Sequence, residues 1–470
     1  MALLLLGQTL VSPASLDPER LAKAHESGAF VQRASPCVTP DLLAREISRL
    51  VAAHPQEVRV ETIGESFLGK SIRLLSVGHG PKSILLWSQM HGDEPSATPA
   101  LLDLGDYLSR HATDPDVHRI LNTFTLRMIP MLNPDGASRY DRRNAQGIDI
   151  NRDALMLATP EGRLLKSVRA RFEPLLGFNL HDQSRRITVG PSGVLSSISL
   201  LAVSGDASGT ITPGRLRAKR VASHIAGVLT GFIPGGIARY DEDWNPRAFG
   251  DNLTAWGSPV VLIESGGFPR GGGFKNLTRL NFIALVSVLD GLARNDLADV
   301  STDVYDRLLR NQADAYADVS ILGASLLEPR TGRWFEADLA FDILSSDQAV
   351  AGCADSVRSG SRIVEVGDGR VVTPGRAIEG KGLLLAPLGK SLNLKPGEIS
   401  AEALVALTPQ ALLKPSADPR ILLAGLNLAE RGFSRNGEAS FVAWIADGTE
   451  RSRGRYFVVI DGTGWPGRAQ

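Results

Sequence analysis

Short apolar runs alternate with stretches of helical periodicity through the first 295 residues, and few folds accommodate this alternation. The strand-type runs cover residues 72–77, 84–90, 124–132, 178–180, 200–203 and 260–263, and the helical stretches cover 97–109, 215–229 and 277–292. Strands that alternate with helices form a sheet whose faces are both covered. We therefore predict an α/β fold with a mixed, mostly parallel sheet sandwiched by helices, and ligands at the carboxyl ends of its strands.

The pattern changes after about residue 300. Short strand-type runs separated by Gly, Pro and Asp now follow one another, at residues 361–366, 382–385, 441–445 and 456–461. Such a pattern is typical of β-rich domains. We expect an N-terminal extension at 1–37, an α/β domain at 38–295 and a β-rich accessory domain at 300–470. All eight histidines precede residue 225, so the accessory domain cannot build a histidine-containing zinc site.

Composition excludes several classes of protein. Lys and Arg total 51, as do Asp and Glu, so the chain has no excess of cations for nucleic acid. No apolar run approaches the ~20 residues of a membrane span. Cys37 and Cys353 lie far apart, in different predicted domains, and we expect them not to pair. Residues 1–15 lack the basic start of a signal peptide, which favours a cytoplasmic location, with export as the alternative.

Ionisable residues follow three of the predicted strands. The run 84–90 is followed by His91 and, three residues later, by Glu94; the run 178–180 is followed by His181 and the run 260–263 by Glu264. The carboxyl ends of parallel strands meet at one edge of a sheet, so these side chains should converge. Two histidines and a carboxylate form a catalytic zinc site that leaves a position for water, and a further glutamate can act as base.

Each of these residues has an ordinary explanation when it is taken alone. A histidine and a glutamate three residues apart occur often without a metal ion, and a histidine after a strand is usually a loop residue. Their joint placement is different, because an apolar strand has little reason to end in an ionisable group that is not used. The four positions together favour a metal site.

Six motifs in order then resemble the metallocarboxypeptidase (funnelin) family over about residues 38–295. They are Ile63-Gly-Glu-Ser-Phe-Leu-Gly-Lys70, His91-Gly-Asp-Glu94, Asn133-Pro-Asp-Gly136, the run from Arg142 through Asn144 and Gly147 to Arg152, Phe178-Asn-Leu-His181 and Leu262-Ile-Glu264. The segments 86–91, 179–183 and 239–241 are similar to a bacterial branch of the family. The resemblance implies that His91, Glu94 and His181 hold one zinc ion per chain, and that Glu264 takes a proton from the water on that ion.

The resemblance also implies residues that contact the substrate. Arg142 would stabilise the oxyanion; Arg143 competes for this role, but the spacing to Asn144 favours Arg142. Asn151 and Arg152 would hold the substrate's terminal carboxylate. Tyr240 is the candidate for the mobile tyrosine of the family, with a packed loop aromatic as the alternative.

The predicted function is zinc-dependent hydrolysis of a peptide bond next to a free C-terminal carboxylate, by a metal-activated water with Glu264 as base. Two alternatives stay open. One is a related zinc amidase or deacylase that acts on N-acyl amino acids or murein peptides, and the other is a binding module with a degenerate site. The substrate's last side chain would meet residues 244–253, where Arg247 or Asp251 could line the pocket or be solvated loop charges. The accessory domain could restrict access, mediate dimerisation or bind substrate.

Overall fold

The computed structural model describes most of the first 312 residues and part of the remainder. The described residues are 16–27, 37–241, 244–269, 273–328, 330–344, 360–379, 381, 383–387, 441–445, 455–460 and 463–468. Contacts divide the chain into two compact units, the first of which includes residues up to Gln312 while the second begins at Ala313. Residues 1–15, for which a signal peptide is the alternative to a cytoplasmic location, lie outside the described residues.

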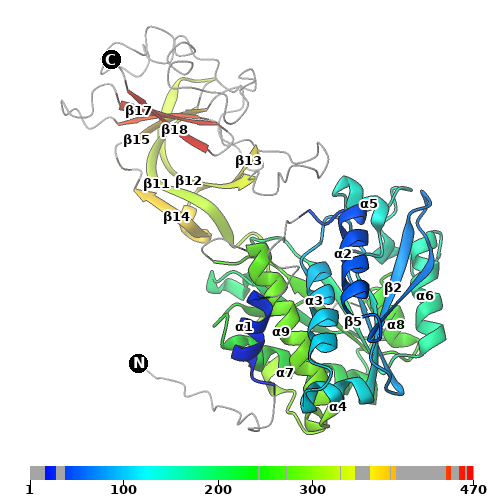
Figure 1. The fold of residues 1–470 in the computed structure, drawn as a ribbon. Helices are drawn as coiled ribbons and strands as arrows, with labels where there is room; N and C mark the ends of the chain where they lie inside the picture. Colours follow the sequence, from blue (N-terminus) through cyan, green and yellow to red (C-terminus); the bar gives the residue numbers. More distant parts are fainter. Residues whose placement is uncertain are drawn as a thin grey trace. The chain divides into compact units, whose positions relative to one another are not determined.

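The first unit is built on an eight-stranded sheet with the order β1-β2-β4-β3-β5-β9-β7-β8 (Figure 1). Its strands are β1 (Val58–Glu65), β2 (Ser71–Val77), β3 (Lys82–Trp87), β4 (Phe124–Ile129), β5 (Leu176–Asp182), β7 (Ile198–Ala202), β8 (Ile237–Arg239) and β9 (Val260–Ser265). The four central strands, β4, β3, β5 and β9, run parallel, whereas β1, β2 and β4 pair antiparallel, as do β7 and β9. The predicted mixed, mostly parallel sheet is confirmed.

Helices cover both faces of this sheet. They are α1 (Pro18–Glu26), α2 (Pro40–Ala53), α3 (Ala97–Arg110), α4 (Pro115–Thr123), α5 (Pro134–Arg139), α6 (Pro160–Phe172), α7 (Pro213–Thr230), α8 (Phe249–Ala255), α9 (Gly273–Ala293) and α10 (Asp303–Asp306). One apolar core joins the sheet to α1, α2, α3, α4, α7 and α9, and a second joins the other face to α6 and α8. Strand β3 shows why: Ile84 and Leu86 enter the first core, Leu85 and Trp87 the second. Alternate residues of a strand point to opposite faces, so a strand buried on both sides is apolar throughout.

Many helices of this unit begin with the same local signal, a polar residue followed by proline. Thr39, Thr159 and Thr212 precede the prolines that begin α2, α6 and α7, and each threonine side chain accepts a hydrogen bond from an amide of the first turn. Proline suits this position because its φ angle is already helical and its missing N–H has no partner inside the helix. The local sequence therefore sets where these helices start.

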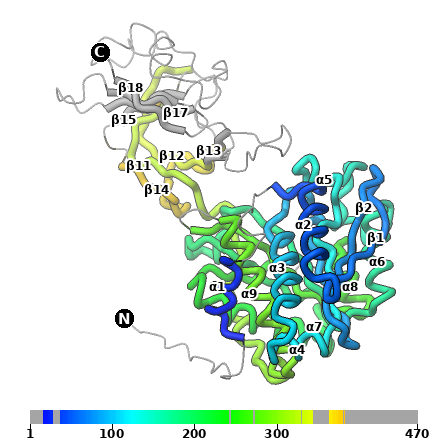
Figure 2. Tube along the Cα trace, in the orientation of Figure 1, coloured from blue at the N-terminus to red at the C-terminus, as the bar shows by residue number. Residues whose placement is uncertain are grey.

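The predicted N-terminal extension contributes a helix to the first unit. Helix α1 packs along α9, and the two lie side by side in Figures 1 and 2. Leu21 is 1% exposed, and the imidazole of His25 lies 3.1 Å from the carboxylate of Asp103 on α3. At the other end, Tyr305 is buried and its hydroxyl accepts a hydrogen bond from the Ala202 amide, so residues beyond 295 also pack here. The predicted domain bounds stay a prediction.

The second unit is β-rich, as predicted. Its sheet has the order β13-β12-β11-β15-β16-β17-β18, and β14 pairs with β11. The strands are β11 (Tyr316–Glu328), β12 (Arg333–Leu344), β13 (Gly360–Gly367), β14 (Thr373–Glu379), β15 (Leu383–Pro387), β16 (Phe441–Ile445), β17 (Arg455–Ile460) and β18 (Thr463–Arg468). Val319, Leu326, Leu339, Phe341 and Ile363 are buried together in its core.

One expectation about the cysteines is wrong. Cys37 is disulfide-bonded, and the sequence contains one other cysteine, Cys353, which lies outside the described residues. The prediction of no pairing rests on the placement of the two residues in different predicted domains, but separation along the sequence does not measure separation in space.

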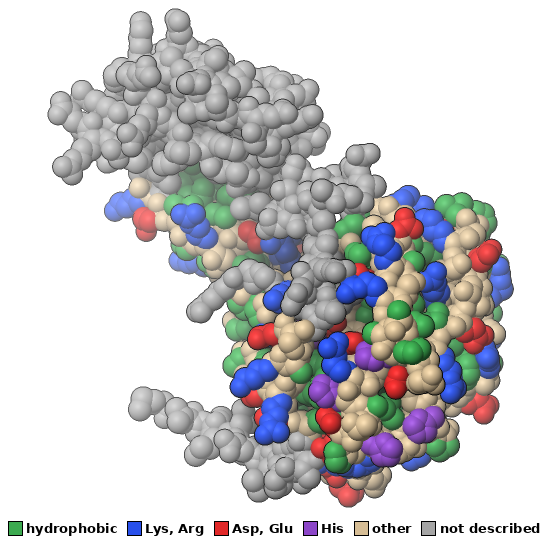
Figure 3. All heavy atoms as spheres, in the orientation of Figure 1, with side chains coloured by type: hydrophobic (Ala, Val, Ile, Leu, Met, Phe, Trp, Pro, Cys, Tyr) green, Lys and Arg blue, Asp and Glu red, His purple; other side chains and the backbone are tan. Residues whose placement is uncertain are grey.

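Surface charge and hydropathy agree with the composition. On the face shown in Figure 3, basic and acidic side chains of the first unit are interspersed. Within the described ranges, no helix combines the length and the apolar character needed to cross a membrane.

Candidate metal centre

Parallel strands bring the candidate residues to one edge of the sheet. In the pairing of β5 with β9, His181 lies directly opposite Glu264. Strand β3 is the other neighbour of β5, and His91 follows its end by four residues. Paired residues of adjacent parallel strands point to the same face, so His181 and Glu264 project together beyond the sheet. The expected convergence at the carboxyl ends is observed.

The segment between β3 and His91 differs from the predicted strand 84–90. The strand ends at Trp87, and Gln89 adopts a left-handed backbone with φ of 43°. This conformation is uncommon for residues other than glycine and requires support from its surroundings. The buried Gln89 amide donates to the backbone carbonyls of Val38 and Gly92 and accepts a hydrogen bond from Thr98. These contacts hold the turn that carries His91.

Three potential ligand atoms meet at this point. The Nδ1 atom of His91 lies 2.7 Å from Glu94 Oε1, and the Nδ1 atom of His181 lies 2.7 Å from Glu94 Oε2. The two Nδ1 atoms are 3.2 Å apart. Ligands of a tetrahedral zinc ion at about 2.0–2.1 Å are separated from one another by about 3.3 Å. The separation of the two histidine nitrogens is close to this value, whereas each lies at hydrogen-bond distance from Glu94; the three buried side chains could together hold a metal ion.

Asp149 contacts His91 at the ring nitrogen that does not face Glu94. Its Oδ1 lies 3.0 Å from His91 Nε2, and its Oδ2 accepts a hydrogen bond from Arg142 Nε at 3.1 Å. Fixing one ring nitrogen of a histidine presents the other nitrogen to a metal ion. Asp149 lies inside the run from Arg142 to Arg152, but no role is predicted for it from the sequence. Its position two residues before Asn151 was the available signal.

Burial and neighbouring charges shift the pKa values of the three residues of the cluster. Burial alone would lower the pKa of His91, but Glu94 and the hydrogen bond to Asp149 raise it to about 9. Burial opposes ionisation of Glu94 too, yet the two histidines hold the pKa of its carboxyl far below the usual range. Burial lowers the pKa of His181. The cluster thus offers a carboxylate and a neutral imidazole, and a metal ion would displace a proton from His91.

Glu264 lies beside the cluster in a buried position. Burial and then the negative charge of Glu94 raise the pKa of Glu264 well above its usual range. Among the described residues, no hydrogen bond to its carboxyl group is found. Tyr240, which follows β8, lies close enough for Glu264 to be the main cause of a raised pKa of its phenol. The role of Tyr240 stays a prediction.

Arg142 reaches the cluster, whereas Arg143 points elsewhere. The Nη1 atom of Arg142 donates to Glu94 Oε1 at 3.0 Å, and its side chain is 43% exposed. Arg143 donates to the carbonyl oxygen of Gly147 and is exposed. The geometry thus agrees with the spacing argument for Arg142.

The NPDG turn connects the two segments that carry this chemistry. The Asn133 side chain caps α5 by accepting from the Gly136 amide, and it donates to the carbonyl oxygens of Met90 and Arg142. A side chain on Gly92 would collide with Gly136, because its Cβ would fall 2.1 Å from the Gly136 carbonyl carbon. The close approach of these two glycines joins the His91 turn to the segment before Arg142.

Asn151 and Arg152 form a short 3-10 helix, Ile150–Arg152, next to the cluster. The Asn151 side-chain oxygen accepts a hydrogen bond from the Phe249 amide at the start of α8, and no partner of its amide nitrogen is found among the described residues. Arg152 donates a hydrogen bond to the Asn151 carbonyl oxygen. Its positive charge acts to lower the pKa of Asp149, Tyr240 and Asp251. Donor groups of both residues are therefore left for a ligand.

The two other candidate charges have structural contacts. Arg247 donates through Nε to the carbonyl oxygen of Arg152, at an exposed position. Asp251 accepts a hydrogen bond from the Asn245 amide at 2.9 Å, and burial raises its pKa to about 6. Both residues help to shape the loop that precedes α8, and neither contacts the three-residue cluster.

The model of one known protein family matches part of this sequence. The sequence model of the zinc carboxypeptidase family matches residues 43–159. This segment contains His91, Glu94, Arg142, Asn151 and Arg152, whereas His181 and Glu264 lie beyond it.

Curated relatives are similar to parts of this chain. Carboxypeptidase Z of Homo sapiens is 28% identical over 180 residues, which cover 34% of this chain and 26% of the relative. A probable carboxypeptidase 2 of Trichophyton verrucosum is 30% identical over 113 residues, which cover 23% of this chain and 21% of the relative. The chain thus spans about a quarter of the length of these curated relatives. Since both are eukaryotic, the bacterial branch stays a prediction.

Solved structures with a similar arrangement include bacterial metallo-carboxypeptidases. The protein from Burkholderia cenocepacia has a TM-score of 0.45 and 16% identity, with 55% of this chain and 69% of that chain covered. The protein from Pseudomonas aeruginosa, solved in complex with (2-guanidinoethylmercapto)succinic acid, has a TM-score of 0.44 and 19% identity, with the same coverage.

Proposed function

We propose that this protein is a zinc carboxypeptidase, which hydrolyses the peptide bond next to a free C-terminal carboxylate. The observation that carries the proposal is the convergence of His91, Glu94 and His181 within ligand distance of one another, with Glu264 directly opposite His181. The family match over residues 43–159 supports it. In this proposal the three residues of the cluster hold one zinc ion per chain.

Glu264 handles the proton. A bound zinc ion lowers the pKa of a coordinated water and polarises the scissile carbonyl group. The buried carboxylate of Glu264 accepts the proton of the attacking water and later delivers it to the leaving amine. Its raised pKa makes it a stronger base than an exposed carboxylate, which suits a group that must both take and return a proton.

Two cationic groups recognise negative charge in the substrate. Arg152, with the amide of Asn151, holds the terminal carboxylate, to which a guanidinium group can donate two parallel hydrogen bonds. Arg142, held by Asp149, stabilises the negative charge that develops on the scissile carbonyl oxygen. Tyr240 closes over the substrate on the Glu264 side.

The test uses the purified, zinc-loaded chain and four substrate classes: peptides with a free C-terminus, the same peptides amidated at the C-terminus, N-acyl amino acids and murein peptides. We expect release of the last residue from the free peptides and little cleavage of the amidated ones. Arg152→Met should raise KM for free peptides about 10–100-fold, because it removes charge-assisted hydrogen bonds to the carboxylate.

Arg143→Met is the matched control, since Arg143 lies in the same segment but contacts Gly147, and its KM should match that of the wild type. Equal cleavage of amidated and free peptides would contradict a carboxypeptidase. Activity confined to N-acyl amino acids or murein peptides would point to the amidase alternative. A purified chain that binds no zinc and cleaves nothing would support the binding module.

A further inference from the structure

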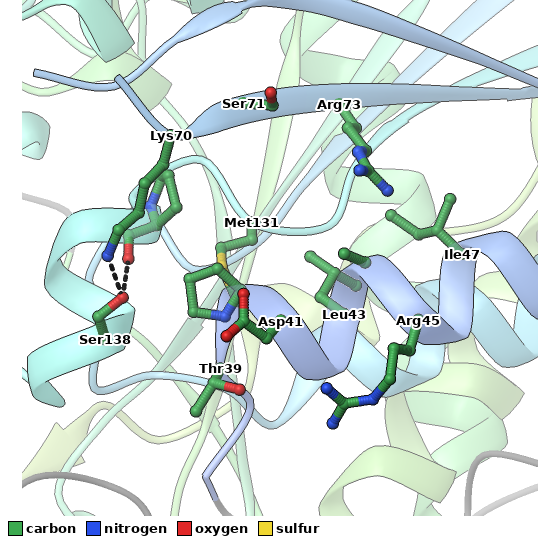
Figure 4. A pocket seen from close by; sticks show the side chains of 13 residues that line it. Thr39, Asp41, Leu43, Arg45, Ile47, Lys70, Ser71, Arg73, Met131 and Ser138 are labelled. Carbon is green, nitrogen blue, oxygen red and sulfur yellow. Dashed lines mark hydrogen bonds between the residues drawn. The ribbon is translucent and has the colours of Figure 1, made fainter. Parts of the chain in front are cut away.

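A cavity of about 650 Å³ lies apart from the candidate metal centre, and its walls come from α2, β2 and α5 with the segment before it (Figure 4). A volume of this size is typical of sites for small molecules. His91, Glu94 and His181 do not line the cavity. A ligand here would therefore occupy a site of its own.

The floor of the cavity is apolar. Leu43 and Ile47 of α2 are 6% and 2% exposed, and Met131, which precedes α5, is 3% exposed. In Figure 4 these side chains lie between α2 and the strand that carries Arg73. Such a floor favours a ligand with an apolar body, because its burial removes apolar surface from water.

The walls carry more positive than negative charge. Arg45, Lys70 and Arg73 line the cavity together with one acidic residue, Asp41. Lys70 is already engaged, since it donates to Ser138 and lies near the carboxylate of Asp135, which is buried behind the wall.

Arg73 has no such partner. It is half-buried on β2, and in Figure 4 its side chain extends from the strand toward α2. Within the described part of the chain, no hydrogen bond or ion pair to the side chain of Arg73 or of Arg45 is found. A guanidinium that is partly shielded from water interacts strongly with an anion, and its planar donors match a carboxylate or a phosphate.

We propose that this cavity binds a small organic anion, a carboxylate or phosphate ester with a short apolar body. The charged end of the ligand pairs with Arg73, and Arg45 adds positive charge at an exposed part of the wall. The apolar body lies on Leu43, Ile47 and Met131. This inference does not rest on the proposed peptidase activity, and its test measures binding alone.

The test is calorimetric titration of the full-length, zinc-loaded chain with hexyl phosphate, hexanoate, inorganic phosphate and hexanol. Hexyl phosphate or hexanoate should bind more tightly than either inorganic phosphate or hexanol, since only the first two combine an anion with an apolar body. The tighter of the two identifies the ligand as a phosphate ester or a carboxylate. Arg73→Gln should weaken that binding at least about tenfold, because it removes charge-assisted hydrogen bonds.

Two further variants test whether the ligand binds in this cavity. Arg59→Gln changes an exposed arginine of β1, the strand next to β2, and should leave the affinity unchanged. Ala44→Trp should also abolish binding, because Ala44 lines the cavity and an indole would fill it. Unchanged affinity in both Arg73→Gln and Ala44→Trp, or equal binding of hexanol and the anions, would overturn the proposal.

Discussion

The first unit contains two buried groups of histidine and carboxylate with different surroundings. Between the helices, His25 meets the single carboxylate of Asp103 at 3.1 Å, and the ring of Phe282 lies 5.0 Å from the imidazole. At the sheet edge, two imidazoles share the carboxylate of Glu94, and their Nδ1 atoms are 3.2 Å apart.

The difference shows that burial and contact with a carboxylate do not by themselves mark a metal site. His25 and Asp103 form one close contact between two helices, and a single imidazole beside a single carboxylate offers too few donor atoms for a metal ion. Two imidazole nitrogens that face each other beside one carboxylate leave a space that suits a cation. Convergence of several donor atoms is therefore the feature that separates the two groups.

The largest expected effect comes from removing one histidine from each group. His181→Ala should lower zinc affinity more than about 100-fold and reduce peptide hydrolysis to background, because only two ligands remain. His25→Ala should keep the zinc content and lower the free energy of unfolding by about 2–4 kcal/mol, because Asp103 loses its buried partner. Metal analysis and urea unfolding measure the two effects; loss of zinc from the His25 variant would erase the distinction.

Glu264→Gln separates metal binding from proton transfer. The substitution keeps the size of the side chain and removes the base, so turnover should fall about 10²–10⁴-fold while zinc content stays at the wild-type level. Steady-state hydrolysis and metal analysis of the same preparation provide the comparison. Turnover close to that of the wild type would show that another group takes the proton.

Asp149→Asn tests whether the carboxylate behind His91 acts through the metal ligand. We expect zinc affinity to fall about 10–100-fold, because the hydrogen bond to His91 Nε2 weakens. Asp153→Asn is the matched control: Asp153 accepts hydrogen bonds from the amides of Ala158 and Thr159, so stability should fall by about 1–3 kcal/mol at unchanged zinc affinity. Equal zinc affinities in the two variants would rule out the role of Asp149.

The smallest effect concerns His224, a buried histidine for which no ion pair with a carboxylate is found among the described residues. Burial lowers the pKa of His224 to about 4, whereas Glu94 and Asp149 raise that of His91 to about 9. The unfolded chain binds a proton at His224 near pH 6.5 and the folded chain does so only near pH 4, so stability is lost as the pH falls between these values. The contribution should be about 1 kcal/mol between pH 7.5 and 5.5.

Urea unfolding of wild type and His224→Gln at the two pH values measures this contribution. The variant lacks the titrating group, so its midpoint should shift less between the two values. A midpoint shift as large as that of the wild type would show that His224 does not titrate as described.

Much of the fold could be predicted because its signals are local. The period of apolar residues predicted β2, β5 and β9 to within a few residues, and the alternation of these runs with helices predicted a sheet covered on both faces. The strand predicted at 84–90 ends three residues early, at Trp87. The reason is that the Gln89 side chain forms hydrogen bonds with Val38 and Thr98, which stabilise a turn in the backbone after the strand. The pairing of Cys37 was missed for the same reason, since it depends on which segments meet.

The sequence by itself determined the candidate residues, because an ionisable group that directly follows a buried strand is visible in the order of residues. Only the tertiary structure decided which atoms meet: Asp149 at His91, His181 at Glu94, and Arg73 facing a cavity with no side-chain partner among the described residues. The physical reason is the separation along the sequence over which each kind of interaction acts. Strand periodicity and helix caps act over a few residues, whereas the contacts of His91 with Asp149 and with His181 join residues that are 58 and 90 positions apart.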